Sequence, residues 1–280
     1  MNPQRQKQLA KKFQEMHRSN KIIVLPNAWD AGGAVIFEQE GFECIGTTSA
    51  GISYSLGLSD GEVISIDDVL DTTKKIQKRI TIPLSVDIER GYGKTHEETL
   101  QNIKTIIKEG VVGINIEDGI SSNNELIPLE EQCKLLEAIT QLRKQMDIDF
   151  VINARTDAFW LGIGSSKEEQ LSLSIKRCNR YLKAGADCVF VPGGLSKEDI
   201  EILIKHIKGP LNIIATPSSP SIAELESMGV ARVSMGSGPV RACLATLKNI
   251  ANEVKKEGTF KNIYKTTIAY DKVNYMFKRS

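Results

Sequence analysis

Short runs of apolar, often β-branched residues alternate along this chain with longer segments of helical periodicity, and this alternation constrains the fold more than any other feature. The pattern gives eight expected strands, at residues 22–26, 44–49, 82–88, 111–118, 149–156, 188–192, 211–217 and 232–236. A strand followed by a covering helix is the repeating unit of a parallel sheet. Eight such units with short connections predict an α/β fold, the (β/α)8 TIM barrel.

The length fits one such barrel. The chain has 280 residues, and barrels of roughly 250 residues fold as one domain. No linker rich in Pro, Gly or Ser divides the sequence, so we expect a single domain over residues 1–280. An open, doubly wound sheet with the same number of strands is the alternative, because closure and handedness of a sheet are not visible in a sequence.

The C-terminal tail, about residues 257–280, is rich in aromatic residues. They are Phe260, Tyr264, Tyr270, Tyr275 and Phe277. A segment with this composition is expected to be packed rather than solvated. We expect a helical extension that covers its own barrel or is exchanged with a neighbouring subunit, and packing on its own barrel is the simpler interpretation.

Composition and charge exclude several classes of partner. The chain has 36 basic and 35 acidic residues, a net charge of +1, so we expect no nucleic-acid or membrane partner but a small molecule or like subunits. The five cysteines are widely spaced and odd in number, which favours reduced, buried thiols. No segment has about 18 uninterrupted apolar residues, and we expect the chain to stay in the cytoplasm.

Acidic residues follow two neighbouring strands at the point where each strand ends. They are Asp87, Glu89, Glu117 and Asp118. Because barrel strands end on one face, these carboxylates should lie close together and repel one another unless a cation neutralises them. Oxygen ligands suit Mg2+ or Mn2+, so the sequence predicts a divalent metal site. The alternative is that some of these acids cap a helix or pair with Arg90 and Lys94.

Other strand ends supply groups that could bind an anion. Arg155 ends the fifth strand and could grip a carboxylate, although a structural pair with Asp157 or a barrel acid is equally expected. Ser49 and the amide groups of TTSAG (47–51) offer a second anion site, and Thr216 ends the seventh strand. The turn MGSGP (235–239) could be a third anion site or only a tight turn.

Three kinds of active site lack the residues that they need. No lysine ends any of the eight strands, which argues against a Schiff-base enzyme. Of the three histidines, we expect His17 and His206 on helix surfaces and His96 at the start of a helix. A histidine zinc site or a Ser-His-Asp triad is therefore not expected.

Seven motifs, taken in order, carry a resemblance to a known family over nearly the whole chain. They are PNAWDAGGA (26–34), TTSAGIS (47–53), GLSDGE (57–62), VDIERGYG (86–93), INIEDG (114–119), NARTDAF (153–159) and VARVSMGSGP (230–239). With these motifs the sequence resembles the isocitrate lyase and phosphoenolpyruvate mutase superfamily. The resemblance implies a Mg2+-dependent barrel that cleaves or forms a carbon–carbon or phosphorus–carbon bond through a pyruvate enolate.

The resemblance also implies roles for single residues. Asp87 would bind the metal directly, and Glu89 and Glu117 would hold metal-bound waters, which leaves Asp118 as a supporting residue. Arg155 would face the substrate carboxylate or the developing oxyanion. The substrate's anionic end would contact Thr48, Ser49 and Ala50, and Asp60 matches a catalytic carboxylate of the family. The family is usually tetrameric, so we expect a homo-oligomer, a tetramer or a dimer.

The chain departs from the family in the loop after the fourth strand. Isocitrate-type lyases carry a Lys-Lys-Cys motif there, whereas residues 119–132 contain neither lysine nor cysteine, and Cys133 is expected in a helix core. The segment Ile120–Pro128 is expected to be a short mobile lid. Glu89 stands where many members have Asp. Glutamate has a longer reach that is compatible with a water-bridged metal. The missing Lys-Lys-Cys motif argues against a standard isocitrate lyase, and the absence of the longer lid of the mutases argues against a standard mutase. What remains resembles the small-lid branch, similar to carboxyvinyl-carboxyphosphonate phosphorylmutase or oxaloacetate decarboxylase.

The leading functional hypothesis is therefore a lyase, decarboxylase or phosphonate-processing enzyme that acts on a small 2-oxo or 2-hydroxy acid or phosphonate. A catalytically silent barrel that binds a small carboxylate or phosphate is the second hypothesis. A phosphate-binding isomerase that uses the turn at 235–239 is disfavoured, since no strand-end Lys or His supplies a base.

Overall fold

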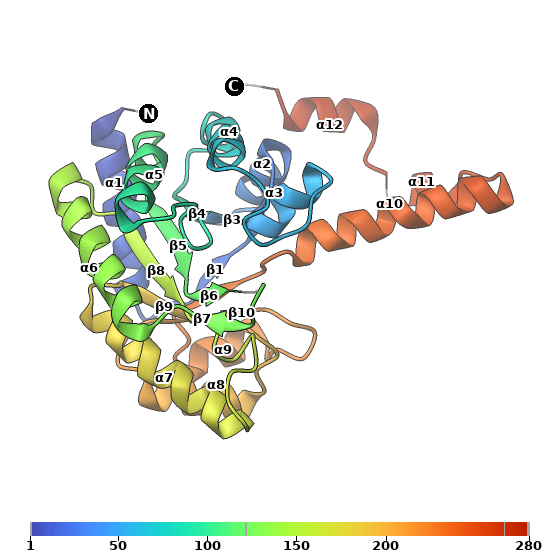
Figure 1. Cartoon of the computed structure of the whole chain (residues 1–280). Helices are drawn as coiled ribbons and strands as arrows, with labels where there is room; N and C mark the ends of the chain where they lie inside the picture. Colours follow the sequence, from blue (N-terminus) through green and yellow to red (C-terminus); the bar gives the residue numbers. More distant parts are fainter. Residues whose placement is uncertain (1, 121, 266, 279–280) are drawn as a thin grey trace.

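The computed structural model describes residues 2–120, 122–265 and 267–278, and a parallel sheet lies at its centre (Figure 1). Its strands are β1 (Ile23–Leu25), β2 (Asn27–Ala28), β3 (Ile45–Thr47), β4 (Leu84–Asp87), β5 (Gly113–Glu117), β8 (Val151–Arg155), β9 (Cys188–Val191), β10 (Leu211–Ile214) and β11 (Arg232–Ser234). Each predicted strand is present at the expected place. The first continues past Pro26 to Ala28, two residues beyond the predicted end.

The order of the strands shows how the sheet closes. It runs β1-β11-β10-β9-β8-β5-β4-β3-β2 in the described residues. The two outermost members, β1 and β2, are consecutive halves of one stretch of chain on either side of Pro26, and β1 pairs with β11 while β2 pairs with β3. Proline has no N–H for a ladder, but its carbonyl still accepts a hydrogen bond from the Gly46 amide at 2.9 Å. The sheet therefore curls round on itself, and the predicted (β/α)8 barrel is confirmed.

Helices surround this sheet (Figure 1). They are α2 (Ala31–Gln39), α3 (Ser49–Ser55), α4 (Ile66–Gln77), α5 (His96–Lys108), α6 (Leu129–Met146), α7 (Lys167–Lys183), α8 (Lys197–His206) and α9 (Ile222–Met228). The sequence sets their starts and buried faces. Ser65 and Ser196 form capping boxes at α4 and α8. Helix α5 buries Ile103, Ile106 and Ile107, whose spacing makes one apolar stripe toward the sheet.

The amino-terminal end of the barrel is covered by α1 (Pro3–Arg18). Phe13 is fully buried there beside the starts of several strands, and a Cβ on Gly113 would lie only 2.7 Å from its ring. His17, expected on the surface, is 3% exposed, because it lies on the face of α1 that carries Ala10 and Phe13. Burial lowers its pKa to about 3. With this end closed, the opposite end is left for a binding site.

Other sequence predictions about histidine and cysteine have mixed outcomes. His96 is the first residue of α5, and His206 ends α8 in an exposed position, as predicted. Four cysteines are buried, including Cys133 in α6, but Cys243 is exposed. The prediction of buried thiols is wrong for Cys243 because its helix, α10 (Gly238–Glu257), leaves the barrel (Figure 1).

The carboxyl-terminal segment forms an arm. Helix α10 projects from the barrel, α11 (Lys261–Lys265) follows, and α12 (Tyr270–Met276) lies back near α2 and α4 (Figure 1). The return is fixed by two hydrogen bonds, from Gln39 Nε2 to the Met276 carbonyl and from Arg79 Nη2 to the Phe277 carbonyl. Both hydrogen bonds hold the end of the described tail against its own barrel. Residues 266, 279 and 280 of the predicted tail lie outside the described residues.

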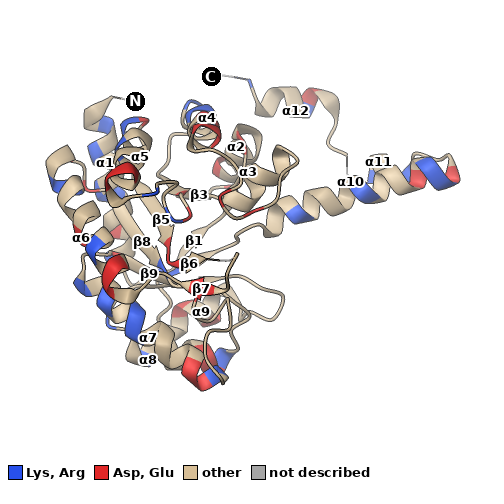
Figure 2. Cartoon of the chain, viewed as in Figure 1, with Lys and Arg blue, Asp and Glu red and all other residues tan. Residues whose placement is uncertain are grey.

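The surface carries charges of both signs. Figure 2 shows Lys and Arg interspersed with Asp and Glu over the helices, as the near-zero net charge predicts. None of the described helices is long and apolar enough to cross a membrane.

Candidate active site

A cavity of about 300 Å³ opens at the carboxyl ends of the barrel strands. It brings together all but one of the predicted site residues. They are Thr48, Ser49, Ala50, Asp60, Asp87, Glu89, Glu117 and Arg155. Thr216 does not line it. It lies in the turn between β10 and α9, where its amide donates to Ser219 Oγ at 2.8 Å.

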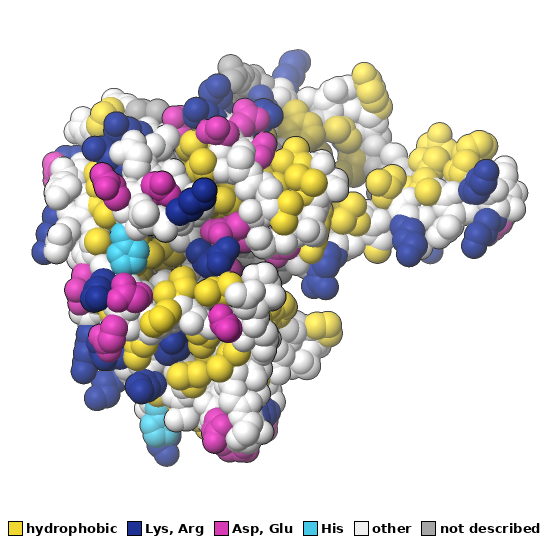
Figure 3. Space-filling model, in the orientation of Figure 1, with side chains coloured by type: hydrophobic (Ala, Val, Ile, Leu, Met, Phe, Trp, Pro, Cys, Tyr) yellow, Lys and Arg dark blue, Asp and Glu magenta, His cyan; other side chains and the backbone are white. Residues whose placement is uncertain are grey.

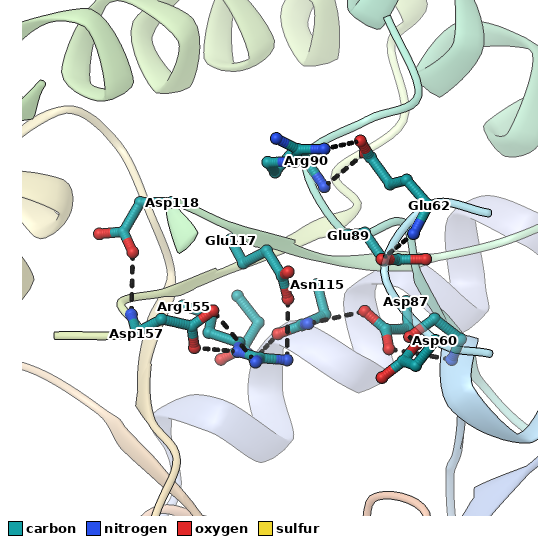
Figure 4. Close-up of polar contacts among 12 residues, drawn as sticks. Asp60, Glu62, Asp87, Glu89, Arg90, Asn115, Glu117, Asp118, Arg155 and Asp157 are labelled. Carbon is teal, nitrogen blue, oxygen red and sulfur yellow. Dashed lines mark hydrogen bonds and ion pairs between the residues drawn. The ribbon is translucent and has the colours of Figure 1, made fainter. Parts of the chain in front are cut away.

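Asp87, the last residue of β4, is held by groups from both sides. Its Oδ2 accepts from the Ser49 amide at 3.1 Å, and its Oδ1 accepts from Asn115 Nδ2 at 2.9 Å. Asn115 on β5 is itself fixed by Asn153 Nδ2, which donates to Asn115 Oδ1 at 2.7 Å. A chain of three side chains on three adjacent strands therefore orients this carboxylate (Figure 4).

Glu89 follows β4 in a backbone conformation that only glycine adopts freely, with a φ of 46°. Its carboxylate accepts from the Glu62 amide at 2.7 Å and from the Tyr92 hydroxyl at 2.6 Å. Burial raises the pKa of Glu89 to about 8, and the charge of Asp87 adds to this shift. A costly backbone conformation held by such contacts is typical of functional sites.

Arg90 and Lys94 do not pair with the strand-end acids. Arg90 instead forms an ion pair with Glu62 at 2.5 Å, and the Lys94 amide donates to Glu98. The Glu62 carboxylate also accepts from the backbone amides of Arg90 and Tyr92. These contacts fasten the loop after α3, which carries Asp60, to the loop after β4 (Figure 4).

Arg155, the last residue of β8, lies between two carboxylates. Its Nε and Nη2 donate to Asp157 at 2.6 and 3.1 Å, and its Nη1 lies 2.8 Å from Glu117 Oε2. Arg155 therefore does form the ion pairs with Asp157 and a barrel acid that the sequence allowed as an alternative to binding a substrate. Arginine has five N–H donors, and these contacts use three of them, so donors remain for a ligand in the cavity. Burial raises the pKa of Glu117 well above its usual range, and Arg155 opposes this shift.

Asp118 has a supporting position. It is fully buried, and its Oδ1 accepts from the Asp157 amide at 2.8 Å. Its Oδ2 accepts from Arg177 Nε at 2.7 Å and from the Tyr181 hydroxyl. Asp118 therefore links α7 to the residue that orients Arg155, and it is not among the residues that line the cavity.

Asp60 reaches the cavity from the loop after α3. Its Oδ1 accepts from Ser49 Oγ at 3.3 Å. Burial raises its pKa, and the charge of Asp87 raises it further. In Figure 4 the carboxylates of Asp60 and Asp87 lie beside each other, so the two acids that the sequence separates by 27 positions form one patch of negative charge.

The donor set of this patch fits a magnesium ion better than a metal that needs several protein ligands. The described residues contain no cluster of three or more His, Cys, Asp or Glu side chains that could hold a metal together. Mg2+ keeps several waters and uses one or two carboxylates. Asp87 has lone pairs left after its two hydrogen bonds. A bound cation would offset the burial and the repulsion by Asp87 that raise the pKa of Asp60 and Glu89.

Several residues of the cavity were not predicted. They are Gly46, Gly61, Ser85, Asn115, Trp160, Phe190, Asn212, Arg232 and Ser234, among others. Most of them lie on the strands, and alternate residues of a barrel strand face its interior. A polar residue two positions before a predicted strand-end residue, such as Asn115 before Glu117, could therefore have been predicted to face the cavity. Trp160 and Phe190 gave no such signal.

The predicted lid is a small hairpin. Strands β6 (Gly119–Ile120) and β7 (Glu125–Leu126) pair antiparallel, and the Ile127 carbonyl accepts from Arg177 Nη2 at 2.6 Å. Residue 121 of the predicted lid lies outside the described residues. The base of the hairpin is therefore anchored to α7.

Comparison with known proteins gives one consistent result. The family model described as phosphoenolpyruvate phosphomutase matches residues 13–255. An uncharacterized protein of Mycobacterium tuberculosis is 35% identical over 242 residues, 86% of this chain and 88% of its own. The 2-methylisocitrate lyase of Halalkalibacterium halodurans is 27% identical over 268 residues, 92% and 85% of the two chains.

Solved structures share the fold. A Burkholderia cenocepacia protein, provisionally described as a lyase/mutase, has a TM-score of 0.90 at 27% identity and covers 99% of this chain and 98% of its own. A phosphonopyruvate hydrolase complexed with oxalate and Mg2+ has a TM-score of 0.83 at 22% identity, with 95% and 94% coverage.

Proposed function

This chain belongs to the phosphoenolpyruvate phosphomutase family, and we propose that it is a Mg2+-dependent lyase or phosphorylmutase that acts next to a 2-oxo or 2-hydroxy acid. The family and its relatives make it an enzyme of the lyase and phosphomutase type. The observation that carries the finer proposal is the convergence of Asp60, Asp87 and Arg155 on one cavity. A metal, an acid–base group and an anion-binding cation would meet there.

The metal would be held by Asp87 directly, with Glu89 and Glu117 farther out. Support comes from the repulsion within the carboxylate patch and from the phosphonopyruvate hydrolase, whose structure contains Mg2+. When bound, Mg2+ acts as a Lewis acid that stabilises the negative charge of an enolate. Mn2+ would suit the same oxygen ligands.

The chain's own residues would position the substrate. The N–H groups of Arg155 that its carboxylate partners leave free would bind the substrate carboxylate or the developing oxyanion. Thr48, Ser49 and Ala50 lie opposite, at the end of β3 and the start of α3, and would contact the anionic end. Because Asp157 and Glu117 fix the guanidinium, little reorganisation is needed when charge develops.

Asp60 is the group that we assign to proton transfer. Its raised pKa favours a carboxyl group that holds a proton closer to neutral pH than a free aspartate does. Ser49 Oγ fixes one of its oxygens. Thr216 would have to leave its turn to reach a ligand, so its predicted substrate contact is the least supported of the set.

One assay tests the proposed activity. The protein is incubated with Mg2+ and, in turn, with oxaloacetate, phosphonopyruvate, 2-methylisocitrate and 2,3-dimethylmalate. Consumption of each substrate beyond that in a protein-free control is followed with and without EDTA. We expect turnover of at least one of these acids that EDTA abolishes. Absence of turnover on all four together with absence of Mg2+ binding would instead favour the silent barrel.

We also propose that the chain is a homo-oligomer. Figure 3 shows hydrophobic side chains along the projecting arm, and Leu244, Leu247 and Val254 of α10 are 43%, 63% and 38% exposed. Exposed apolar groups that follow one face of a helix favour burial against another chain. The number of subunits and the cytoplasmic location stay predictions.

A further inference from the structure

Arg232, the first residue of β11, is a buried cation without a counter-ion. It is 2% exposed and lines the inner part of the cavity. Its Nε and Nη1 have no hydrogen-bond partner among the described residues, and no described carboxylate forms an ion pair with it. A buried charge without a partner is strongly unfavourable, so this position calls for a compensating group.

Two other residues of the same cavity, Asn212 and Ser85, carry unpartnered polar groups in the described part of the chain. Asn212 on β10 is its direct neighbour in the sheet register, is fully buried, and has no partner for either its Nδ2 or its Oδ1 in the described part of the chain. Ser85 on β4 is 2% exposed, and its Oγ likewise lacks a described partner. Both residues line the same cavity. One cavity is therefore lined by guanidinium, amide and hydroxyl donors that lack described partners, and the first two come from adjacent strands.

The two arginines of the cavity differ in charge balance. Arg155 has two carboxylate partners, Glu117 and Asp157, whereas Arg232 has none. The groups whose charges act on Arg232 are the thiols of Cys44 and Cys188 and the carboxylate of Asp87. Burial raises the pKa of both thiols to about 12, so they are neutral at pH 7. The inner end of the cavity is thus positive, while its outer part is acidic.

We propose that Arg232, Asn212 and Ser85 form an oxyanion site at the inner end of the cavity, and that this site takes a carboxylate group. A guanidinium binds a carboxylate with two parallel hydrogen bonds, and an amide N–H and a hydroxyl can complete its shell. Water can satisfy the hydrogen bonds but cannot neutralise the charge. The carboxylate belongs either to the far end of a dicarboxylate substrate or to a free monocarboxylate. The first of these two assignments rests on the proposed function.

Formate is the probe that separates this site from the proposed metal chemistry. The full chain is first freed of divalent metal with EDTA, and the EDTA is then removed by dialysis into a metal-free buffer of low chloride without phosphate or carboxylates. Formate is added to this protein during thermal unfolding and calorimetric titration. We expect the melting temperature of the wild type to rise saturably with formate. Because EDTA removes Mg2+, this result does not depend on whether the protein turns over any substrate.

Arg232→Met removes the charge and keeps most of the volume. We expect its affinity for formate to fall at least tenfold. In buffer without formate the variant should melt at a higher temperature than the wild type, since an uncompensated buried charge is gone. Arg241→Met is the matched control: Arg241 is exposed on α10, and its loss should change neither property.

Asn212→Asp places a carboxylate next to Arg232 and tests the inference independently of whether Arg232→Met folds. We expect this variant to melt at a higher temperature than the wild type without formate and to lose the response to formate, because the counter-ion is now built in. Asn212→Leu, which supplies no charge, should not show the rise in melting temperature.

Two results would overturn the inference. The first is a melting temperature that rises equally with formate in the wild type and in Arg232→Met. The second is a wild type whose melting temperature does not change with formate, together with an Arg232→Met variant that melts at a lower temperature than the wild type. That result would mean that water fills the inner end of the cavity. A competition experiment distinguishes the two sources of the carboxylate. If malonate displaces formate, the site takes the far end of a dicarboxylate. If malonate and formate bind at the same time, the site takes a separate monocarboxylate. Both outcomes support a carboxylate site at Arg232.

Discussion

Asp87 is the residue on which the proposed metal chemistry depends most. Asp87→Asn keeps the shape of the side chain but removes the negative charge, so we expect a loss of at least about 100-fold in Mg2+-dependent kcat. The variant should still unfold cooperatively, since the amide oxygen can accept from either Asn115 Nδ2 or the Ser49 amide, and only one of the two hydrogen bonds is lost. Steady-state assays and thermal unfolding measure both effects. Asp67 is an exposed acid at the start of α4, and Asp67→Asn serves as the control. Unchanged Mg2+-dependent activity of Asp87→Asn would refute the role of Asp87 as a metal ligand.

Arg155 gives a second prediction for a single residue. Arg155→Ala should cost about 3 kcal/mol or more of transition-state stabilisation, measured as kcat/KM, and should also destabilise the fold because two carboxylates lose their partner. Arg143→Ala separates the two effects. Arg143 forms a partly buried ion pair with Asp187 at 2.5 Å and does not line the cavity, so its loss should lower stability alone. A loss of activity below tenfold in Arg155→Ala would contradict our assignment.

The site residues show what a sequence can and cannot give at the residue scale. Asp87, Glu117 and Arg155 were predictable because parallel strands bring their carboxyl ends to one face. The partners of these residues were not. Glu89 is held by an amide 27 positions away, and Arg232 has an ordinary strand position whose burial follows only from closure of the barrel. Contacts of this kind depend on how loops and strands meet in three dimensions.

At the scale of elements, helix α7 supports the site from outside the barrel. Arg177 on α7 donates to Asp118 and to the carbonyl of Ile127 at the base of the lid hairpin. Arg177→Met should destabilise the protein by about 3 kcal/mol, because Asp118 would be left buried without a cation. Urea unfolding measures this change. Arg180→Met on the same helix breaks only the half-exposed pair with Glu130 and should cost no more than about 1 kcal/mol.

A second variant shows whether the charge of Asp118 is the cause. Combining Arg177→Met with Asp118→Asn should restore part of the lost stability, since the buried charge is then absent. If the double variant is as unstable as the sum of the single ones, packing of α7 rather than the ion pair explains the effect. The existence of α7 was evident from its periodicity, but this contact with the fourth strand was not.

At the scale of the whole molecule, the projecting arm is the feature that the barrel pattern explains least. Alternating strands and helices predicted the barrel because each unit buries its apolar face within the chain. Helix α10 has only Val240 and Glu253 buried, at 3% and 4% exposure, although its apolar residues follow a helical period. Among the described residues, Leu244, Leu247 and Val254 of this helix stay exposed, and the simpler prediction that the tail covers its own barrel is met near Met276 and Phe277.

The arm therefore gives the last prediction, which concerns assembly. We expect the protein to sediment as a dimer or tetramer, with a melting temperature that rises with protein concentration. Leu247→Lys introduces a charge at the most exposed leucine of α10 and should shift the assembly toward the monomer. Lys248→Gln alters the next residue, which is also exposed, and should leave it unchanged. A wild type that sediments as a monomer at every concentration would contradict the proposed assembly, whereas the activity assigned to the cavity is tested separately by the substrate assay.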